Sequence, residues 1–176
     1  MTHMIPAALA AALTLVPHLG LAHATLEQQQ AALNSTYKGV MRIGHGCDGE
    51  ATLRVTISIP EGVIAVKPMP KPGWTLETEV TPYARSYDYH GSHAEGVTRI
   101  TWSGGALPDA HYDEFVFRAR ITDAFAAGEV IHFPTVQTCA NGEEAWVNLP
   151  AKGQSGHDIE GPAPALRLID GAHAHH

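Results

Sequence analysis

The residues with the clearest chemical potential lie where a short apolar segment gives way to a histidine, at Gly20-Leu21-Ala22-His23. Small residues at positions 20 and 22 form the pattern that a signal peptidase cleaves. Cleavage after Ala22 makes His23 the first residue, so that it carries an α-amine as well as an imidazole. Both nitrogens lose a proton readily near neutral pH and can chelate one metal ion. Cu(II), which favours tetragonal N and O ligands, suits this pair best, although zinc and nickel accept the same ligand types.

Residues 1–22 are expected to be a signal peptide that is removed on export to the periplasm or the cell exterior. Residues 5–19 are mostly Ala, Leu and Val, which is about the length of a secretory apolar segment and too short to span a bilayer as a helix. The first four residues contain neither Lys nor Arg, so the competing interpretation is an N-terminal helix of a cytosolic protein. No later apolar run approaches transmembrane length, and we expect no membrane span in the mature chain.

The charge of the chain limits its partners. Its 176 residues carry a formal net charge of −7, to which residues 1–22 contribute no Asp, Glu, Lys or Arg. Because contacts with phosphates need a basic face, nucleic acid is not expected as a partner. The rest of the chain is long enough for one domain with its own core, which we assign to residues 23–170. A His-rich tail, residues 171–176, follows. Two interpretations of this tail stay open. Either His173, His175 and His176 act as an auxiliary metal-scavenging segment, or the segment is a solvated tail.

The two cysteines, Cys47 and Cys139, suit an exported protein. In an oxidising compartment, an even pair far apart in sequence most simply forms one disulfide. Closing so long a loop stabilises the fold by about 4 kcal/mol in the chain-entropy model. The competing interpretation is a pair of thiolate ligands for a soft metal ion.

The body of the chain shows the alternation of β-strands. From Thr52 to Ile59, the residues Leu53, Val55, Ile57 and Ile59 share one face and polar residues share the other, which is typical of a half-buried antiparallel strand. Further strands are predicted at 74–80, 97–102, 114–121, 130–138, 145–149 and 165–169. Pro, Gly and Asn predict turns at 60–62, 72–73, 103–105 and 141–142. Residues 123–128 give the one hint of a helical turn.

Short strands at this spacing, without helical crossovers, favour an all-β domain. We expect a β-sandwich of the immunoglobulin or cupredoxin kind with about 7–9 strands and one disulfide. A barrel is the alternative. Trp74 and Trp102 are expected to pack in the core.

Five stretches resemble the YcnI-like copper-binding family, which consists of extracytoplasmic β-sandwich proteins with a mature N-terminal histidine. Single stretches are weakly specific, but their order and spacing cover nearly the whole mature domain. They are His23-Ala24-Thr25-Leu26; Pro60 to Val63 followed by KPMPKPGW from Lys67 to Trp74; Ile100 to Gly105 (ITWSGG); Tyr112 to Phe117 (YDEFVF); and His157-Asp158 with Pro162 to Leu166.

The resemblance implies that Cu(II) is bound by the N-terminal histidine, a carboxylate on the second strand and a nearby tryptophan, an arrangement described as a one-histidine brace. The histidine corresponds to His23, and the tryptophan, on a late strand after a tight turn, corresponds to Trp146. The Trp146 ring is expected to shield the ion or to make a cation–π contact. The carboxylate has no counterpart, because an ungapped comparison of residues 34–44 with the second strand places Tyr37 there.

His45 is our candidate for the missing ligand. A tight hairpin turn at residues 141–142 sets Trp146 nearly opposite Gln137. A disulfide between the two cysteines then brings the His45 segment to within about 10 Å of Trp146. At about 3.3 Å per residue, an extended strand brings residues 37 and 45 to one site only if it bends. The alternatives that stay open are Tyr37 and Glu27.

These residues predict an exported copper-binding protein that acts as a chaperone or store in copper homeostasis and not as an enzyme. Its expected cargo is Cu(II), and its expected partner is another copper transport or chaperone protein. Two alternatives stay open. A copper-dependent oxidative enzyme with an N-terminal histidine would turn over with oxygen and a reductant, whereas a structural or interaction β-sandwich would show no tight Cu(II) binding.

Overall fold

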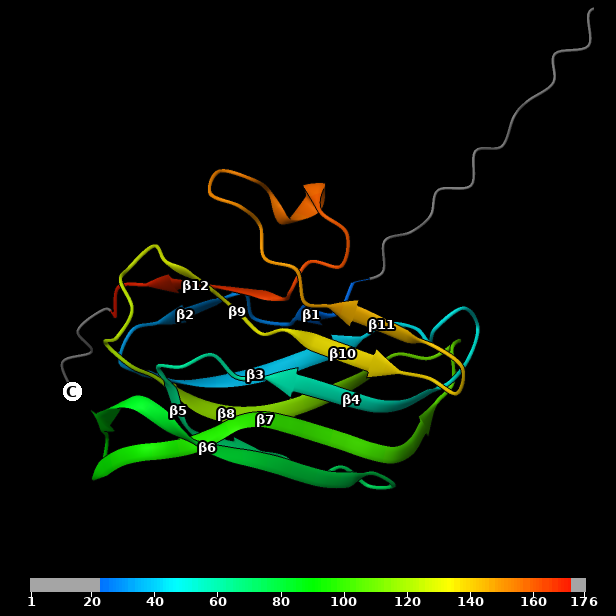
Figure 1. Ribbon diagram of the computed structural model, residues 1–176, viewed down its shortest axis with the longest axis horizontal. Helices are drawn as coiled ribbons and strands as arrows, with labels where there is room; N and C mark the ends of the chain where they lie inside the picture. The colour runs from blue at the N-terminus through cyan, green and yellow to red at the C-terminus, as the bar shows by residue number, and fades with distance from the viewer. Residues whose placement is uncertain (1–22, 172–176) are drawn as a thin grey trace, which may run out of the picture.

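A computed structural model describes residues 23–171 (Figure 1). The predicted signal peptide and the three tail histidines lie outside these residues. The described part contains twelve strands and one 3-10 helical turn, η1, at Gly156–Asp158. The strands are β1 Thr25–Leu26, β2 Gln30–Ala32, β3 Ser35–Ile43, β4 Thr52–Ser58, β5 Val63–Pro68, β6 Thr75–Asp88, β7 Ser92–Leu107, β8 Asp113–Ile121, β9 Val130–His132, β10 Thr135–Thr138, β11 Glu143–Trp146 and β12 Ala165–Ile169.

The strands form three sheets that run along the long axis of the molecule (Figure 1). The first sheet has the order β1-β3-β8-β5, and the second has the order β11-β10-β4-β7-β6. A smaller sheet has the order β2-β12-β9. The β12–β2 pair is parallel, and the other pairs are antiparallel. Each sheet keeps two edge strands, so the barrel alternative was wrong.

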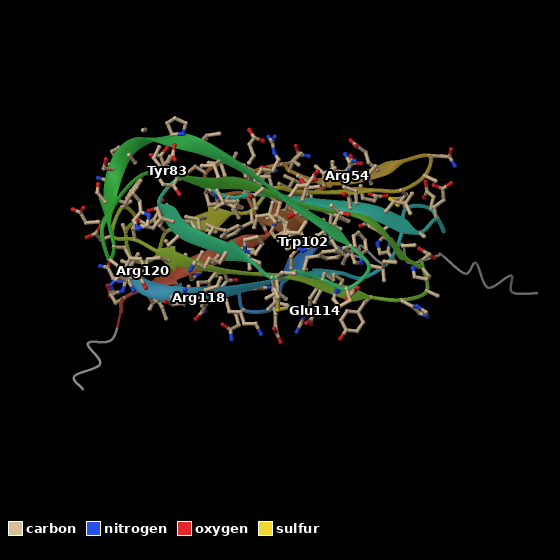
Figure 2. All side chains as sticks on the ribbon, turned by 90° about the horizontal axis from the view of Figure 1, so that it is seen from below. Arg54, Tyr83, Trp102, Glu114, Arg118 and Arg120 are labelled. Carbon is tan, nitrogen blue, oxygen red and sulfur yellow. A yellow bond between two sulfur atoms is a disulfide. The ribbon has the colours of Figure 1, made fainter. Side chains whose placement is uncertain are left out.

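One core joins the two larger sheets. Phe115 and Phe117 of β8 and Trp102 of β7 are fully buried, and the rings of Trp102 and Phe115 meet edge-on with 5.5 Å between their centroids. Trp74 packs against this core from its edge. Figure 2 shows Trp102 in the middle of the molecule and Glu114 on its outside. The predicted β-sandwich and the core positions of both tryptophans are confirmed.

The alternation predicted for β4 is confirmed over most of the strand. Val55, Ile57 and Ile59 are buried as expected. The prediction for Leu53 was wrong, because its side chain is 37% exposed and the neighbouring Thr52 is fully buried. The pairing of β4 with β7 shifts at this end of the strand. Such an irregularity exchanges the inward and outward positions.

The predicted disulfide is confirmed, and the thiolate-ligand alternative was therefore wrong. Cys47 and Cys139 are bonded, with 6.0 Å between their Cα atoms and a sequence separation of 92. The bond joins the turn between β3 and β4 to the turn between β10 and β11. It therefore ties the first sheet to the edge of the second at one end of the sandwich.

The longest strands extend well beyond their predicted ranges. β6 and β7 pair from Thr75–Ser103 to Asp88–Ser92. The turn predicted at residues 103–105 lies inside β7. Gly104 there has a φ of 76°, and Gly105 lies so close to the Trp74 ring that a Cβ would collide with it. These glycines indicated a turn, but they have other roles here. Gly104 allows the positive φ, and Gly105 leaves room for the Trp74 ring.

The count of twelve strands exceeds the expected number for identifiable reasons. The segment predicted as 130–138 is divided at Phe133-Pro134 into β9 and β10, which belong to different sheets. β1 and β2 contain only 2 and 3 residues, too few to show a period. Residues 123–128 form turns and no helix. Among residues 23–171, no helix has the length and apolarity to cross a bilayer.

Candidate metal centre

His23 lies immediately before β1 at the edge of the first sheet. Ala24 and Leu26 are 3% and 2% exposed, because they turn into the core. His23 and Thr25 alternate with them and are half-buried. The burial of Ala24 and Leu26 therefore fixes the backbone beside His23, although the pairing of β1 with β3 begins only at Thr25.

The end of this sheet places three residues from distant segments in one row. Thr25 of β1 pairs with Arg42 of β3, and Ile43 of β3 pairs with Asp113 of β8. Because these strands are antiparallel neighbours, continuing the register two positions beyond Thr25 and Arg42, and one position beyond Ile43 and Asp113, gives residues that lie side by side. The residues at these positions are His23, Gly44 and Tyr112.

His23 lines two hollows. The first, which we call the outer hollow, has a volume of about 420 Å³ and is lined by His23, Thr25, Arg42, Gly44 and Tyr112. The second hollow, of about 310 Å³, separates the start of β1 from the segment that contains η1 and leads into β12. It is lined by His23, Ala24, Thr25, Leu26, Gln29, Ser155, Gly156, Pro162, Ala163, Pro164 and Ala165.

His45 lies in a tightly restrained corner just beyond β3. The Gln137 side-chain amide donates a hydrogen bond of 2.6 Å to the His45 carbonyl. The Gly46 N–H donates one of 2.9 Å to Asp109 Oδ1, and Cys47 is held by the disulfide. Three consecutive residues are thus fixed from two different segments, residues 137–139 and the β7–β8 connection. Since Gly44 lies beside His23, the structure brings the His45 segment to His23.

The His45 ring contacts the backbone of its own segment. Its Nδ1 meets the Gly46 carbonyl oxygen, which can only accept a hydrogen bond. In the tautomer that donates this bond, the proton is on Nδ1 and the lone pair is on Nε2.

Asp109 was missed by the sequence analysis. It lies in the connection between β7 and β8. Its carboxylate accepts a hydrogen bond from the Gly46 N–H, which is 63 positions away in the sequence. No local pattern marked it, because only the return of β8 alongside β3 brings this connection to the His45 corner. Asp109 supplies a carboxylate at the His45 corner.

The structure places Tyr37, one of the alternative ligands, in the core. Its side chain is 3% exposed, and its ring packs between Phe117 and Phe133. Its hydroxyl donates a hydrogen bond of 2.7 Å to the Gln28 carbonyl. Burial, assisted by the nearby Glu27 charge, raises the pKa of the Tyr37 phenol. A phenol that keeps its proton inside the core is unsuited to bind a metal ion.

Glu27 is engaged elsewhere. Its carboxylate lies 2.9 Å from Arg42 Nη2, and Arg42 Nε lies 3.6 Å from Glu114. Four residues of largely extended chain separate Glu27 from His23, a span of roughly 13 Å. This ion pair and this span argue against Glu27 as a ligand that shares one ion with His23.

Trp146 lies two positions away from its predicted register. It pairs with Thr135, and Gln137 pairs with Glu144. The reason is a four-residue loop, 139–142, closed by a hydrogen bond of 2.8 Å from the Cys139 N–H to the Gly142 carbonyl. Asn141 and Gly142 therefore form half of the loop and not all of it.

The Trp146 side chain belongs to the core. It is 5% exposed and is part of the large buried cluster that also includes Ala24 and Leu26. Two residues further on, Asn148 pairs with Pro162, which lines the second hollow with His23. The strand that carries Trp146 is thus adjacent to the wall of a hollow at His23.

Side chains alone do not form a complete metal site in the described part of the chain. Among residues 23–171, no three His, Cys, Asp or Glu side chains are grouped to hold one ion. The α-amine that cleavage after Ala22 would expose on His23 would add a backbone donor at this end of the sandwich.

Comparisons with known proteins agree with this architecture. A similar solved structure is described as "Crystal structure of an uncharacterized protein from Nocardia farcinica reveals an immunoglobulin-like fold", and it matches with a TM-score of 0.61 and 25% sequence identity. The similarity covers 84% of this chain and 98% of that one. No curated protein matches the chain. The likeness confirms the predicted immunoglobulin-like fold.

The family comparison covers the same region as the resemblance noted in the sequence. The model of the family described as "Domain of unknown function (DUF1775)" matches residues 23–168. The match therefore begins at His23 and ends in β12. The chain belongs to DUF1775, the YcnI-like family.

Proposed function

We propose that the protein is exported, is trimmed to His23, and then captures Cu(II) as a carrier or store in copper homeostasis. The observation that carries this proposal is the position of His23, half-buried at the rim of two hollows and next to the restrained His45 corner. Its α-amine and imidazole provide two nitrogens that suit Cu(II).

The third ligand in this proposal comes from the His45 corner. His45 supplies Nε2, which carries the lone pair in the tautomer that donates from Nδ1 to the Gly46 carbonyl. Asp109, which already binds the Gly46 N–H, holds the corner and offers a carboxylate oxygen in place of the acid that the family resemblance implied. Trp146 packs in the core, on the strand that leads to the wall of the second hollow, and in this proposal it excludes water from the core side of the site.

Two further observations support export. The disulfide is of the kind that persists in oxidising compartments. The family match begins at His23, which is the residue that cleavage after Ala22 would make the first.

A carrier suits this geometry better than an oxidative enzyme. A site with few protein ligands at the rim of open hollows lets a copper transport partner replace those ligands stepwise. The copper enzymes that use an N-terminal histidine add a second histidine opposite it and a flat aromatic surface for a polymer. Tyr112, 66% exposed, is the one tyrosine, tryptophan or phenylalanine that lines the outer hollow, and one ring makes no such surface.

The test compares two forms of the protein by Cu(II) titration and electron paramagnetic resonance (EPR). One form begins at His23, and the other carries one extra alanine before it. We expect a tight Cu(II) signal with nitrogen hyperfine structure for the first form and its loss for the second. Equal binding by both forms would place the site elsewhere. A first form without tight binding would favour a structural or interaction role.

The third ligand is tested in the form that begins at His23. We expect His45→Ala to weaken Cu(II) binding by about tenfold or more, because the site loses one of three donors. Asp109→Asn keeps a hydrogen-bond acceptor for Gly46 and removes the charge, so it separates a ligand role from a positioning role. His132→Ala, in β9 of the smaller sheet, is the control, and we expect it to leave the signal unchanged.

A further inference from the structure

We propose that the outer face of the first sheet binds the surface of a membrane that contains anionic phospholipids. The contact is made by three cationic side chains, Lys38, Arg118 and Lys67, which we call the basic row, together with the neighbouring Met69. This inference goes beyond copper capture and does not depend on it, because no metal ion takes part in the contact.

The basic row crosses three adjacent strands. Arg118 of β8 pairs with Lys38 of β3 on one side and with Lys67 of β5 on the other. All three side chains are exposed, and Figure 2 shows Arg118 on the outside of the molecule. The residues that precede them in the sequence point the other way and lie in the core: Tyr37, Phe117 and Val66. At about 4.8 Å between strands, the row is roughly 10 Å wide.

The cations of this row have no anionic partner within the part of the chain that the structure describes. The Lys and Arg side chains that form ion pairs there, with N–O distances up to 4.0 Å, are Arg42, Lys71 and Arg99. Like charges directly opposite one another on neighbouring strands destabilise a sheet. The first sheet nevertheless places three cations in register, on a chain with a formal net charge of −7. An anionic surface removes this repulsion when it binds.

The outward-facing acid on β8 is too distant to neutralise the row. Glu114 lies four residues from Arg118 in an extended strand, a span of about 13 Å. Its carboxylate is also paired with Arg42 at 3.6 Å. Charges on a protein surface are screened over about 8 Å at physiological ionic strength. The same screening weakens the effect of the carboxylates on the other faces of the molecule.

The acids at the opposite end of β8 are balanced by cations of their own. Asp88 and Asp123 line a hollow of about 210 Å³ together with Arg85 and Arg120. Two carboxylates and two guanidinium groups leave no net charge there. Arg120 is therefore not counted in the basic row, although it lies two residues from Arg118 on the same strand. The basic row itself keeps a local positive charge.

An exposed methionine adjoins the basic row. The Met69 N–H donates a hydrogen bond of 2.8 Å to the Val116 carbonyl, which continues the pairing of β5 with β8 two residues beyond Lys67. The Met69 side chain is 53% exposed. A membrane surface suits this combination, because its headgroups offer phosphates to the cations and the acyl chains below them accept an apolar group.

The spacing of the row favours a membrane over an acidic peptide. Carboxylates on one face of an extended peptide repeat at about 6.6 Å, whereas the cations lie about 4.8 Å apart across the strands. A peptide that adds to a sheet needs free backbone groups at an edge. Lys38 and Arg118 lie on β3 and β8, which are interior strands of the first sheet. Lipid headgroups move within their layer and can meet cations at any spacing.

The experiment measures cosedimentation with lipid vesicles at about pH 7.5, where histidines are largely neutral. It uses the form of the protein that begins at His23, because an uncleaved signal peptide would itself enter a membrane. Vesicles of phosphatidylcholine alone are compared with vesicles that also contain phosphatidylglycerol, each over a series of salt concentrations. The variant that removes the basic row is Lys38→Gln, Lys67→Gln, Arg118→Gln.

Matched variants control for net charge and for loss of an apolar side chain. Met69→Ser is compared with Val80→Ser, because both side chains are 53% exposed and Val80 lies on β6 of the second sheet. Thermal unfolding verifies that each variant is folded. The charge control removes three exposed cations from other surfaces: Arg54→Gln, Lys152→Gln, Arg167→Gln.

We expect the wild type and the charge control to bind the anionic vesicles, with an affinity that falls as salt is added, and to leave the neutral vesicles unbound. The variant without the basic row should bind about 100-fold more weakly, at about fivefold for each cation. Met69→Ser should weaken binding by about threefold, and Val80→Ser should leave it unchanged.

Three outcomes overturn this inference. They are absence of binding to the anionic vesicles, equal affinities of the basic-row variant and the charge control, and tighter binding of a poly-glutamate peptide than of the anionic vesicles. The last outcome would assign the basic row to an acidic protein partner. Since none of these measurements contains copper, the proposed function is tested separately from this inference.

Discussion

The side-chain amide nitrogen of Gln137 lies 2.6 Å from the backbone carbonyl oxygen of His45, so that a fully buried residue of β10 fixes the candidate metal ligand. The same amide nitrogen lies 2.6 Å from Thr52 Oγ1. The Gln137 Oε1 atom has no hydrogen-bond partner in the described part of the chain. A buried amide with an unsatisfied oxygen destabilises the folded state. At this position the amide N–H group holds the His45 carbonyl in place.

Gln137→Met should therefore lower both stability and Cu(II) affinity. The substitution preserves the shape of the side chain and leaves the His45 carbonyl without its buried donor. We expect the free energy of unfolding to fall by about 1–3 kcal/mol, measured by urea denaturation. Cu(II) affinity should fall as well, because the His45 segment is no longer held. Gln30→Met, at an exposed position of β2, is the control. Unchanged Cu(II) affinity of Gln137→Met would show that His45 needs no such support.

Removal of the disulfide should have the larger effect on stability. The double variant Cys47→Ser, Cys139→Ser releases a crosslink across 92 residues, and we expect a loss of about 2–5 kcal/mol. Thermal unfolding of the wild type with and without a reductant should show the same direction. If reduction left the midpoint unchanged, the two turns would be held by other contacts, and the restraint on the His45 corner would have to be reassigned.

Tyr37→Phe separates a structural from a ligand role. The phenol donates to the Gln28 carbonyl from inside the core, so its removal should reduce the free energy of unfolding by about 1 kcal/mol. The Cu(II) spectrum should not change, because the hydroxyl does not reach the site. Tyr112→Phe, on the rim of the outer hollow, serves for comparison. A changed Cu(II) spectrum in Tyr37→Phe alone would restore Tyr37 as a ligand.

The sequence was informative where period and chain connectivity decide the structure. The strand period of β4 predicted the buried positions of Val55, Ile57 and Ile59. The two cysteines predicted the bond that restrains the residues next to His45, and the cleavage pattern indicated His23. Each of these inferences needs only local alternation or one covalent constraint.

The sequence did not predict the features that depend on the exact strand register or on contacts between distant segments. The β10–β11 loop has four residues, which moved Trp146 opposite Thr135, and the sequence Asn-Gly alone does not distinguish this loop from a two-residue turn. The side chain of Tyr37 points into the core from β3. The ungapped comparison of residues 34–44 did not show which side chains of this strand point inward. Asp109 joined the site only through the pairing of β3 with β8.

The acid sensitivity of the disulfide-linked end should depend on Glu50. Its carboxylate accepts hydrogen bonds from the Asn141 side chain at 2.6 Å and from the Asn141 N–H at 2.9 Å, and these bonds hold the pKa of Glu50 below its ordinary value of 4.5. The folded state therefore binds this proton less tightly than the unfolded state. The contribution of Glu50 to stability is complete above that ordinary value and is lost as the pH falls through the lowered folded pKa.

Glu50→Gln should accordingly flatten the loss of stability between about pH 7 and about pH 3, measured as the difference in urea midpoints at the two values. Asn141→Ala should flatten it in the same direction, because it removes the side-chain donor that lowers the pKa of Glu50. Glu143→Gln, an exposed neighbour in β11, controls for the loss of one carboxylate. A slope in Glu50→Gln equal to that of Glu143→Gln would mean that the bonds between the two turns contribute nothing to the acid response. Since these turns also carry the disulfide, the same pH series with the reductant present tests whether the hydrogen bonds and the crosslink stabilise this end independently.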